Sequence, residues 1–273
     1  MTASLLVLFF VGLAVGVTTV LFGFGGGFVT VPIILLVDAA RGPDALRIAV
    51  ATSALVMLVG AIVATAATRR SVLAHLRGRR RLFVLLAVGG AAGAVGALLV
   101  PDVVPRWGFV IYIGVTVVDL LLRPGFLPER RTTRRLESGR GARKTSGRPL
   151  PDGWGLPIGG CAAFLGVGGS VMTVPMMRRS GMEMGVATSL ANPLTIAIAA
   201  PAMVVAAAFG GGVASAPGLI GTVDVASALA LLAGAIPVIV LLRRRPPKIP
   251  DAVHSWAYLA LLVVAASTVA ITG

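Results

Sequence analysis

Two stretches of the chain, GFGGGFVTVPII at residues 23–34 and GVGGSVMTVPMM at residues 166–177, match each other without a gap. The identical positions include five pairs of glycine, threonine and proline: Gly23 and Gly166, Gly25 and Gly168, Gly26 and Gly169, Thr30 and Thr173, and Pro32 and Pro175. A long internal match of this kind predicts a chain built from two similar halves.

A second match follows the first in the same order. The segment Val-Ala-Thr-Ser at residues 50–53 returns at residues 186–189. Each half then has the same plan, with a glycine-rich segment, a Thr-Ser segment and two further apolar runs. Two matches in the same order make a chance resemblance between the halves improbable.

The composition indicates a membrane protein. Of the 273 residues 57% are apolar and 12% are charged, and the mean hydropathy is +0.96, whereas charged residues make up about a quarter of a soluble domain. The apolar runs are continuous, which favours helices over the alternating strands of an outer-membrane barrel. The runs are 3–22, 28–37, 46–68, 82–100, 107–122, 154–177, 184–209, 219–242 and 252–272.

The basic residues predict which loops share a side of the membrane. The net charge is +14, but most of it gathers in loops 69–81, 123–148 and 243–248, the pattern of cytoplasmic loops in a multi-pass protein of the cell membrane. Nucleic-acid binding is therefore not expected. Anionic lipid headgroups are possible partners of these loops, at about 1 kcal/mol per basic residue.

The same charges predict the arrangement of the halves. Residues 1–122 form the first transmembrane repeat, 123–152 a basic cytoplasmic linker and 153–273 the second repeat. Placing all three basic loops on one side requires run 154–177 to enter and leave on that side. We therefore expect an all-α polytopic protein with inverted repeats, each with a glycine-broken helix followed by three spans. Whether residues 3–37 are re-entrant or make two crossings stays open.

The glycine-rich segments are candidate sites for an anion. Gly23, Gly25, Gly26 and Gly27 lie within five residues, and each glycine costs a helix about 1 kcal/mol relative to alanine. We expect the helix to unwind there, with Thr30 and Thr173 as caps of the helices that follow. Amides freed at a helix start attract anions. Close helix packing is the simpler alternative.

A polar face on run 184–209 is the second candidate. Thr188, Asn192 and Thr195 are spaced i, i+4, i+7 and share one helix face, with Ser189 beside them. These side chains can bind an oxyanion, or they can hold helices together for about 0.6 to 2 kcal/mol each. Val56 stands where Asn192 does, so we expect an asymmetric cavity.

The sequence offers little support for nucleotide hydrolysis, a metal site or proton transfer. The chain has no Gly-Lys-Ser or Gly-Lys-Thr phosphate loop, and Cys161 is its one cysteine. His75 and His254 lie in or beside loops, where we expect them to be solvated or interfacial. The acidic residues fall near the ends of runs, which disfavours proton relays. We therefore expect no metal, no cofactor and no enzymatic activity.

Together, GFGGGFVTVP, GVGGSVMTVP and the following ATS segments, with Asn-Pro after the second, resemble the sulfite exporter TauE/SafE family. The resemblance covers both halves. It implies a secondary transporter of the cytoplasmic membrane for small sulfur-containing anions such as sulfite, sulfonates or organosulfur acids. Carried onto this sequence, it implies a pathway lined by Gly23, Gly25, Gly26, Gly27, Thr30, Thr52, Ser53, Gly166, Gly168, Gly169, Ser170, Thr173, Thr188, Ser189 and Asn192.

Two other functions remain open. An intramembrane enzyme would use Ser53, Ser170 or Ser189 as a nucleophile and would need a base within the membrane. An anion channel would conduct without saturating. The expected direction is export, and the sequence does not specify an oligomeric state.

Overall fold

The computed structural model describes residues 2–24, 30, 34, 45–101, 103–122, 150–209 and 218–272. Nearly all of these residues are helical, as the apolar runs predict. The first half contains α1 (Thr2–Phe22), α3 (Ala45–Ala66), α4 (Arg70–Leu73), the short 3-10 helix η2 (Ala74–Leu76), α5 (Arg80–Leu98) and α6 (Val103–Leu122). The second half contains η3 (Asp152–Trp154), α7 (Gly155–Phe164), α8 (Ser170–Arg179), α9 (Met184–Phe209), the strands β1 (Leu219–Ile220) and β2 (Val223–Asp224), α10 (Val225–Arg244) and α11 (Asp251–Thr272).

Seven helices are long and apolar enough to cross a membrane, namely α1, α3, α5, α6, α9, α10 and α11. The prediction of a polytopic all-α membrane protein is therefore confirmed. The two strands form only a small antiparallel hairpin, in which Leu219 pairs with Asp224. Most of the predicted run 28–37 and most of the predicted linker 123–152 lie outside the described residues.

The run 154–177 forms two half-length helices instead of one span. α7 and α8 have ten residues each, so each is about 15 Å long, half of the about 30 Å of hydrocarbon. Asp152, just before α7, pairs with Arg79 at 2.6 Å. Arg179, at the end of α8, pairs with Asp119 near the end of α6 at 2.6 Å. Both arms therefore begin and end at the same end of the molecule.

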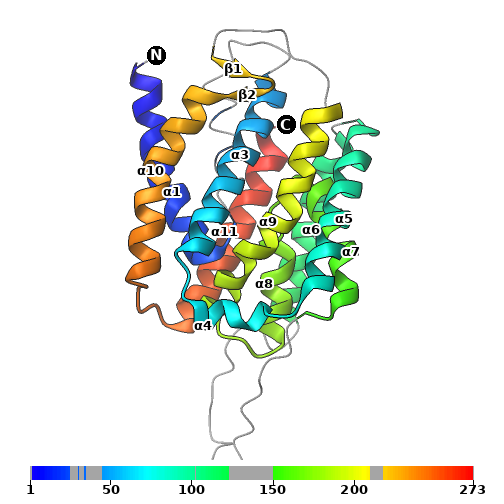
Figure 1. The fold of residues 1–273 in the computed structure, drawn as a ribbon, viewed down its shortest axis with the longest axis vertical. Helices are drawn as coiled ribbons and strands as arrows, with labels where there is room; N and C mark the ends of the chain where they lie inside the picture. The colour runs from blue at the N-terminus through cyan, green and yellow to red at the C-terminus, as the bar shows by residue number, and fades with distance from the viewer. Residues whose placement is uncertain are drawn as a thin grey trace, which may run out of the picture.

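This end, which we call the basic end, collects the loops that the sequence predicts to share one side. The connection from α3 to α5 through α4, the last turns of α8 and α10, and the first turn of α11 all lie there (Figure 1). The N-terminus, the C-terminus and the β1–β2 hairpin lie at the opposite end (Figure 1). The grouping of the basic loops agrees with the charge pattern.

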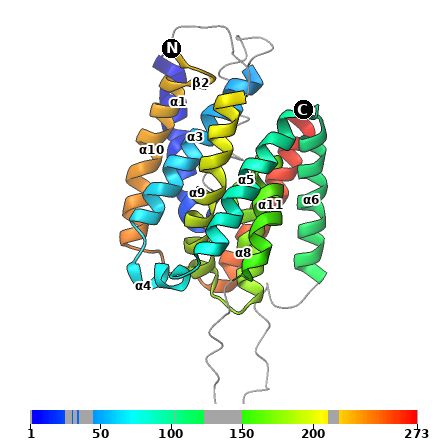
Figure 2. The same cartoon turned by 45° about the vertical axis from the view of Figure 1, so that its right-hand side comes forward.

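The directions of the helices follow from these ends. α1, α3, α6, α8 and α10 run toward the basic end, whereas α5, α7, α9 and α11 run away from it (Figures 1 and 2). α9 lies between α3 and α5 and contacts both (Figure 2). Its residues Leu190, Leu194 and Ile198 are at most 1% exposed. The helix that carries the predicted polar face is thus the central helix of the bundle.

Glycines allow two helix pairs to pack backbone against backbone. In α1, a Cβ on Gly12 would overlap a backbone carbonyl of α10, and one on Gly16 would lie 2.7 Å from the next. In α5, a Cβ on Gly89 or Gly93 would overlap carbonyl oxygens of α7. Close approach of this kind is a common way for helices to associate in lipid. The partner helices lie in opposite halves of the chain, so these contacts join the halves.

We expect Gly93→Ala to lower the free energy of unfolding by about 1 to 3 kcal/mol, because the added methyl overlaps the carbonyl oxygen of Gly160 and α5 must move away from α7. The matched control is Gly114→Ala, where the added methyl has no heavy atom within 4 Å among those compared. Thermal unfolding of the purified variants in detergent measures both. Equal melting temperatures for Gly93→Ala and wild type would contradict this packing.

We also expect single cysteines at His75 and Ile220, in a Cys161→Ser background, to be labelled from opposite sides of the membrane. His75 lies in η2 at the basic end and Ile220 in the hairpin at the other end, and both are exposed. A membrane-impermeant maleimide on intact cells should label position 220 and reach position 75 only after lysis. Labelling of both positions in intact cells would contradict the predicted crossings.

Candidate functional site

The second glycine-rich segment breaks a helix inside the bundle. α7 ends at Phe164 and α8 begins at Ser170. Gly166 has a φ of +66°, and the amide of Val167 donates back to the carbonyl of Ala162 at 2.9 Å. A left-handed glycine with this bond ends a helix without leaving its last carbonyls unpaired. The predicted unwinding at this segment is confirmed.

The first segment ends a helix in the same way at the equivalent position. α1 ends at Phe22, and Gly23, which aligns with Gly166, has a φ of +75°. Its amide donates to the carbonyl of Thr19 at 3.1 Å. Both halves therefore use the first glycine of the repeated motif to stop a helix. Gly25, Gly26 and Gly27, which follow it, lie outside the described residues.

The two breaks meet. A Cβ on Gly23 would lie 2.9 Å from the carbonyl oxygen of Thr188 and 3.5 Å from the Cβ of Ser170. A Cβ on Gly168 would lie 3.4 Å from the carbonyl oxygen of Phe24 and 3.4 Å from the Cγ2 of Thr195. The 2.9 Å at Gly23 is too short for a real Cβ, so this position requires glycine, whereas the other distances are ordinary contacts. We call this meeting point the glycine junction and define it by Gly23, Phe24, Gly168, Gly169, Ser170, Thr173, Thr188, Asn192 and Thr195.

The polar face of α9 lines the glycine junction. Thr188 lies against the first break and Thr195 against the second, so Asn192, on the same face between them, faces the junction. Asn192 and Thr195 are fully buried, and Thr188 is 1% exposed. The amide nitrogen of Asn192 donates to the carbonyl of Thr188 at 3.2 Å. The predicted polar face therefore points into the protein.

Four polar atoms at the glycine junction are buried and have no hydrogen-bond partner among the described residues. They are Ser170 Oγ, Thr173 Oγ1, Asn192 Oδ1 and Thr195 Oγ1. A buried polar group without a partner costs about 1 to 3 kcal/mol, and native structures contain few of them. Three of them are hydroxyls, which can donate a hydrogen bond, and Asn192 Oδ1 is an acceptor.

The predicted site residues Thr30, Thr52 and Ser53 of the first half lie on or against α3. Thr30 and Ser53 are buried, and their hydroxyl oxygens lie 2.5 Å apart. The neighbouring Thr52 does not join them, because its hydroxyl accepts from the amide of Asp224 at 2.9 Å. Asp224 also caps α10 by accepting from the amides of Ala226 and Ser227. Thr52 thus ties α3 to the start of α10.

The predicted cap after the second break is wrong, and His254 is less exposed than a solvated residue. Thr173 is not the cap of the helix after the break, because α8 begins three residues earlier and its N-cap residue is Gly169. Pro175 accordingly lies inside α8 and not in its first turn. His254 is not solvated: it lies in α11, is 8% exposed, and its Nε2 is 2.5 Å from the carbonyl oxygen of Leu21.

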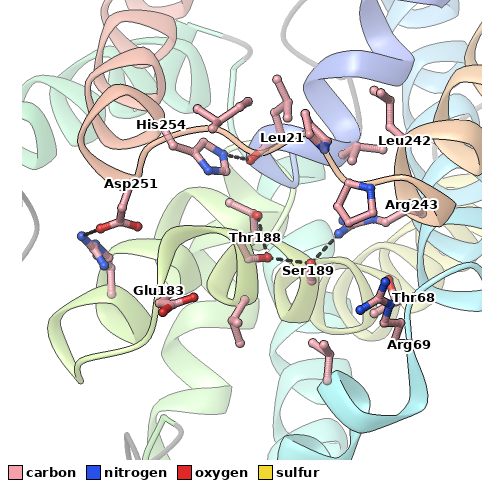
Figure 3. A pocket seen from close by; sticks show the side chains of 18 of the residues that line it. Leu21, Thr68, Arg69, Glu183, Thr188, Ser189, Leu242, Arg243, Asp251 and His254 are labelled. Atoms are coloured by element: carbon pink, nitrogen blue, oxygen red, sulfur yellow. Dashed lines mark hydrogen bonds and ion pairs between the residues drawn. The ribbon is translucent and has the colours of Figure 1, made fainter.

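A cavity of about 1200 Å³ extends from the basic end toward the glycine junction (Figure 3). It is bounded by the end of α1, the connection after α3, the start of α9, the end of α10 and the start of α11. Thr188 and Ser189 line it, and the carbonyl of Thr188 abuts Gly23. The cavity therefore reaches from the basic end to Thr188, the residue whose carbonyl contacts the first break.

Basic side chains outnumber acidic ones around this cavity. Arg69, Arg178 and Arg243 line it together with Glu183 and Asp251. Asp251 pairs with Arg178 and accepts from the amide of Met184 at 3.0 Å, so these two charges offset each other. Arg69 and Arg243 then remain beside Glu183. Among the described residues, no group of three or more His, Cys, Asp or Glu side chains could hold a metal ion.

Comparison with protein families decides the wider class. The family model described as sulfite exporter TauE/SafE matches residues 8–269, nearly the whole chain. The chain belongs to the sulfite exporter TauE/SafE family. Membership in this family implies a membrane transporter of sulfur-containing anions. Comparison with curated proteins found no significant match. Comparison with solved structures found none either.

In this TauE/SafE family member, the structure brings only some of the predicted residues together. Gly23, Gly168, Gly169, Ser170, Thr173, Thr188 and Asn192 belong to the glycine junction. Gly166 is exposed and ends α7 through its left-handed backbone conformation. Ser189 turns toward the cavity, where its hydroxyl donates to the carbonyl of Gly185 at 2.6 Å. Ser53 and Thr30 pair with each other beside α3.

Sequence reasoning missed Arg243 as a site residue. Its position in a basic cluster at the end of an apolar run indicates only membrane topology. Its contact with Ser189, 54 residues away, exists only because α9 and α10 come together. A residue-by-residue pattern contains no signal for such a contact.

We expect Gly23→Ala to destabilise the protein more than Gly78→Ala. Both glycines have a φ near +75°, so both variants suffer the same left-handed strain of about 1 to 2 kcal/mol. Only at Gly23 does the added methyl also meet the carbonyl of Thr188, at 2.9 Å; at Gly78 no compared atom lies within 4 Å. Thermal unfolding should give a lower melting temperature for Gly23→Ala. Equal melting temperatures would mean that the breaks do not touch.

Proposed function

We propose that this protein is a secondary transporter that exports small sulfur-containing anions, such as sulfite, sulfonates or organosulfur acids, and binds them at the glycine junction. The observation that carries the proposal is the group of four buried polar atoms without partners where the two breaks meet. Unwound backbone inside a membrane is tolerated where it is buried or lines a cavity. A bound anion would accept hydrogen bonds from the three hydroxyls, those of Ser170, Thr173 and Thr195.

The chemistry of the junction supports an anion over a cation. The hydroxyls of Ser170, Thr173 and Thr195 can each donate a hydrogen bond. No side chain caps the start of α8, whose N-cap residue is Gly169, and the positive end of a helix dipole favours negative charge. The described residues that define the junction include no carboxylate, so none of their side chains carries a negative charge that would repel an anion.

The inverted arrangement expected from the sequence would support alternating access to this site. α1, α3, α5 and α6 have as sequence counterparts α7, α9, α10 and α11, and each counterpart runs in the opposite direction (Figures 1 and 2). The glycine contacts are reciprocal: α1 packs on α10 and α7 packs on α5. Transporters built from inverted repeats bind their substrate where broken helices meet and rock one part against another.

The membrane potential supports the direction of transport. With the basic loops 69–81, 123–148 and 243–248 in the cytoplasm of a cell with a potential of about 100 mV, negative inside, each charge gains about 2.3 kcal/mol on leaving. A dianion gains about 4.6 kcal/mol, enough for a gradient of about a thousandfold at 1.4 kcal/mol per tenfold. Export therefore needs no coupling ion.

The surroundings of the serines argue against an intramembrane enzyme. Ser53 pairs with Thr30, and Ser189 pairs with Arg243 and Gly185. The two histidines are engaged elsewhere: His75 binds the carbonyl of Val72 on the surface and His254 binds that of Leu21. A serine nucleophile needs a base within hydrogen-bond reach, and the recorded hydrogen bonds of both histidines go to backbone carbonyls instead.

We expect purified protein in proteoliposomes to carry sulfite or methanesulfonate with saturable kinetics and to respond to a set membrane potential. Saturation follows from a limited number of binding sites, whereas a channel would show flux that rises linearly with concentration. Flux into sulfite-trapping buffer, measured across a concentration series, distinguishes the two. Protein-free liposomes provide the background, and flux indistinguishable from it for every sulfur anion would contradict the proposal.

We expect Ser170→Ala, Thr173→Val and Asn192→Leu each to reduce this flux about tenfold, because each removes a polar group from the glycine junction and about 1.4 kcal/mol corresponds to tenfold. The matched control is Thr65→Val. Thr65 also has a buried hydroxyl without a described partner, but it lies near the end of α3, away from the glycine junction. Losses equal to that of Thr65→Val would place the binding site elsewhere.

A further inference from the structure

Arg243 differs from the other arginines at the end of α10. Arg244 and Arg245 are exposed, as expected of arginines that extend toward water and lipid headgroups at a membrane surface. Arg243, one residue earlier, turns into the protein and lines the cavity at the basic end (Figure 3). Its guanidinium donates from Nη1 to the hydroxyl of Ser189 on α9. A role in membrane anchoring does not require this inward position.

The other two nitrogens of Arg243, Nε and Nη2, lie along one edge of its guanidinium group. Nε and Nη2 are buried and have no hydrogen-bond partner among the described residues. These two nitrogens carry the parallel N–H groups on one side of the guanidinium plane, which bind two oxygens of a carboxylate, phosphate or similar oxyanion side by side. The third nitrogen, Nη1, donates to Ser189. This bond restrains the orientation of the guanidinium group and leaves the Nε–Nη2 edge facing away from Ser189.

We propose that Arg243, oriented by Ser189, is an oxyanion-binding site at the inner part of the cavity and takes an anion that offers two oxygens on one face, such as a sulfonate or sulfite. Burying charged donors without a partner is costly, and a bidentate anion would offset this cost. This inference rests on the proposed function only for the step in which the bound anion moves on to the glycine junction.

The charges around Arg243 support this assignment. Arg69 lies on the same side of the cavity, and its side chain is exposed (Figure 3). The carboxylate of Asp251 is occupied by Arg178 and by the amide of Met184. Glu183 lies on the other side of the cavity (Figure 3). Among the described residues that line this cavity, no carboxylate is recorded as a partner of Arg243, so its charge is available to an anion.

The position of Arg243 also places this site before the glycine junction on a path from the basic end. Ser189, which holds Arg243, directly follows Thr188, whose carbonyl abuts Gly23. Arg243, Thr188 and Ser189 line one cavity, so an anion on Arg243 would share that cavity with the residue that contacts the first break. The site can collect anions from the basic end and present them to the junction.

The test is calorimetric titration of the purified full-length protein with methanesulfonate, with chloride as a single-atom anion for comparison. Arg243→Lys keeps the charge but loses the paired N–H groups, and we expect it to bind methanesulfonate about tenfold more weakly. Ser189→Ala, which frees the guanidinium to rotate, should weaken binding about threefold to tenfold. Arg244→Lys is the matched control and should bind like wild type. Wild type should prefer methanesulfonate to chloride at least tenfold.

Three results would overturn the site: no methanesulfonate binding by wild type, equal binding by wild type and Arg243→Lys, or equal affinity of wild type for chloride and methanesulfonate. Melting temperatures of the variants exclude loss of folding as the cause. Flux measurements separate this inference from the proposed function. If sulfite transport saturates but binding is the same in wild type and Arg243→Lys, only the Arg243 site is contradicted. If binding depends on Arg243 but no sulfur anion is transported, the Arg243 site is supported and the proposed function is contradicted.

Discussion

A helix that stops inside a membrane must satisfy its free backbone groups without water, and the rest of this structure depends on how that constraint is met. Gly23 and Gly166, at equivalent positions of the repeat, adopt left-handed conformations that end α1 and α7. The two ends are then placed against each other, with Gly23 beside Ser170 and Gly168 beside the carbonyl of Phe24. A side chain at Gly23 would lie too close to the carbonyl oxygen of Thr188, so this glycine allows the first break to pack against α9.

The position of the breaks explains the arrangement around them. α9 must lie at the centre of the bundle, since its polar face from Thr188 to Thr195 covers both breaks. The half-length of α7 and α8 leaves their outer ends at the basic end. There a cavity with more basic than acidic side chains reaches Thr188. In the proposed function, an anion enters this cavity, meets Arg243 and then binds the buried hydroxyls of the glycine junction.

The sequence predicts much of this fold because the relevant patterns are linear. Apolar length identifies the spans, the repeated glycines identify the breaks, and the basic loops identify which ends lie together. The site is only partly predictable. The spacing of Thr188, Asn192 and Thr195 indicates their common face, but the start of α8 at Ser170 leaves Thr173 inside the helix, contrary to its expected role as a cap. Arg243 and His254 gain their roles from contacts with α9 and α1, and a linear pattern contains no information on such distant contacts.

The central claim is that the two glycine breaks together form the anion site. The most direct measurement is sulfite and methanesulfonate efflux from proteoliposomes at a fixed potential, comparing wild type with the double variant Gly26→Leu, Gly169→Leu, which changes the same motif position in both halves. The account predicts saturable efflux by wild type and its loss in a double variant that still folds as a helical, monodisperse protein. Equal efflux by the two proteins would contradict the account and place the anion pathway away from the glycine junction.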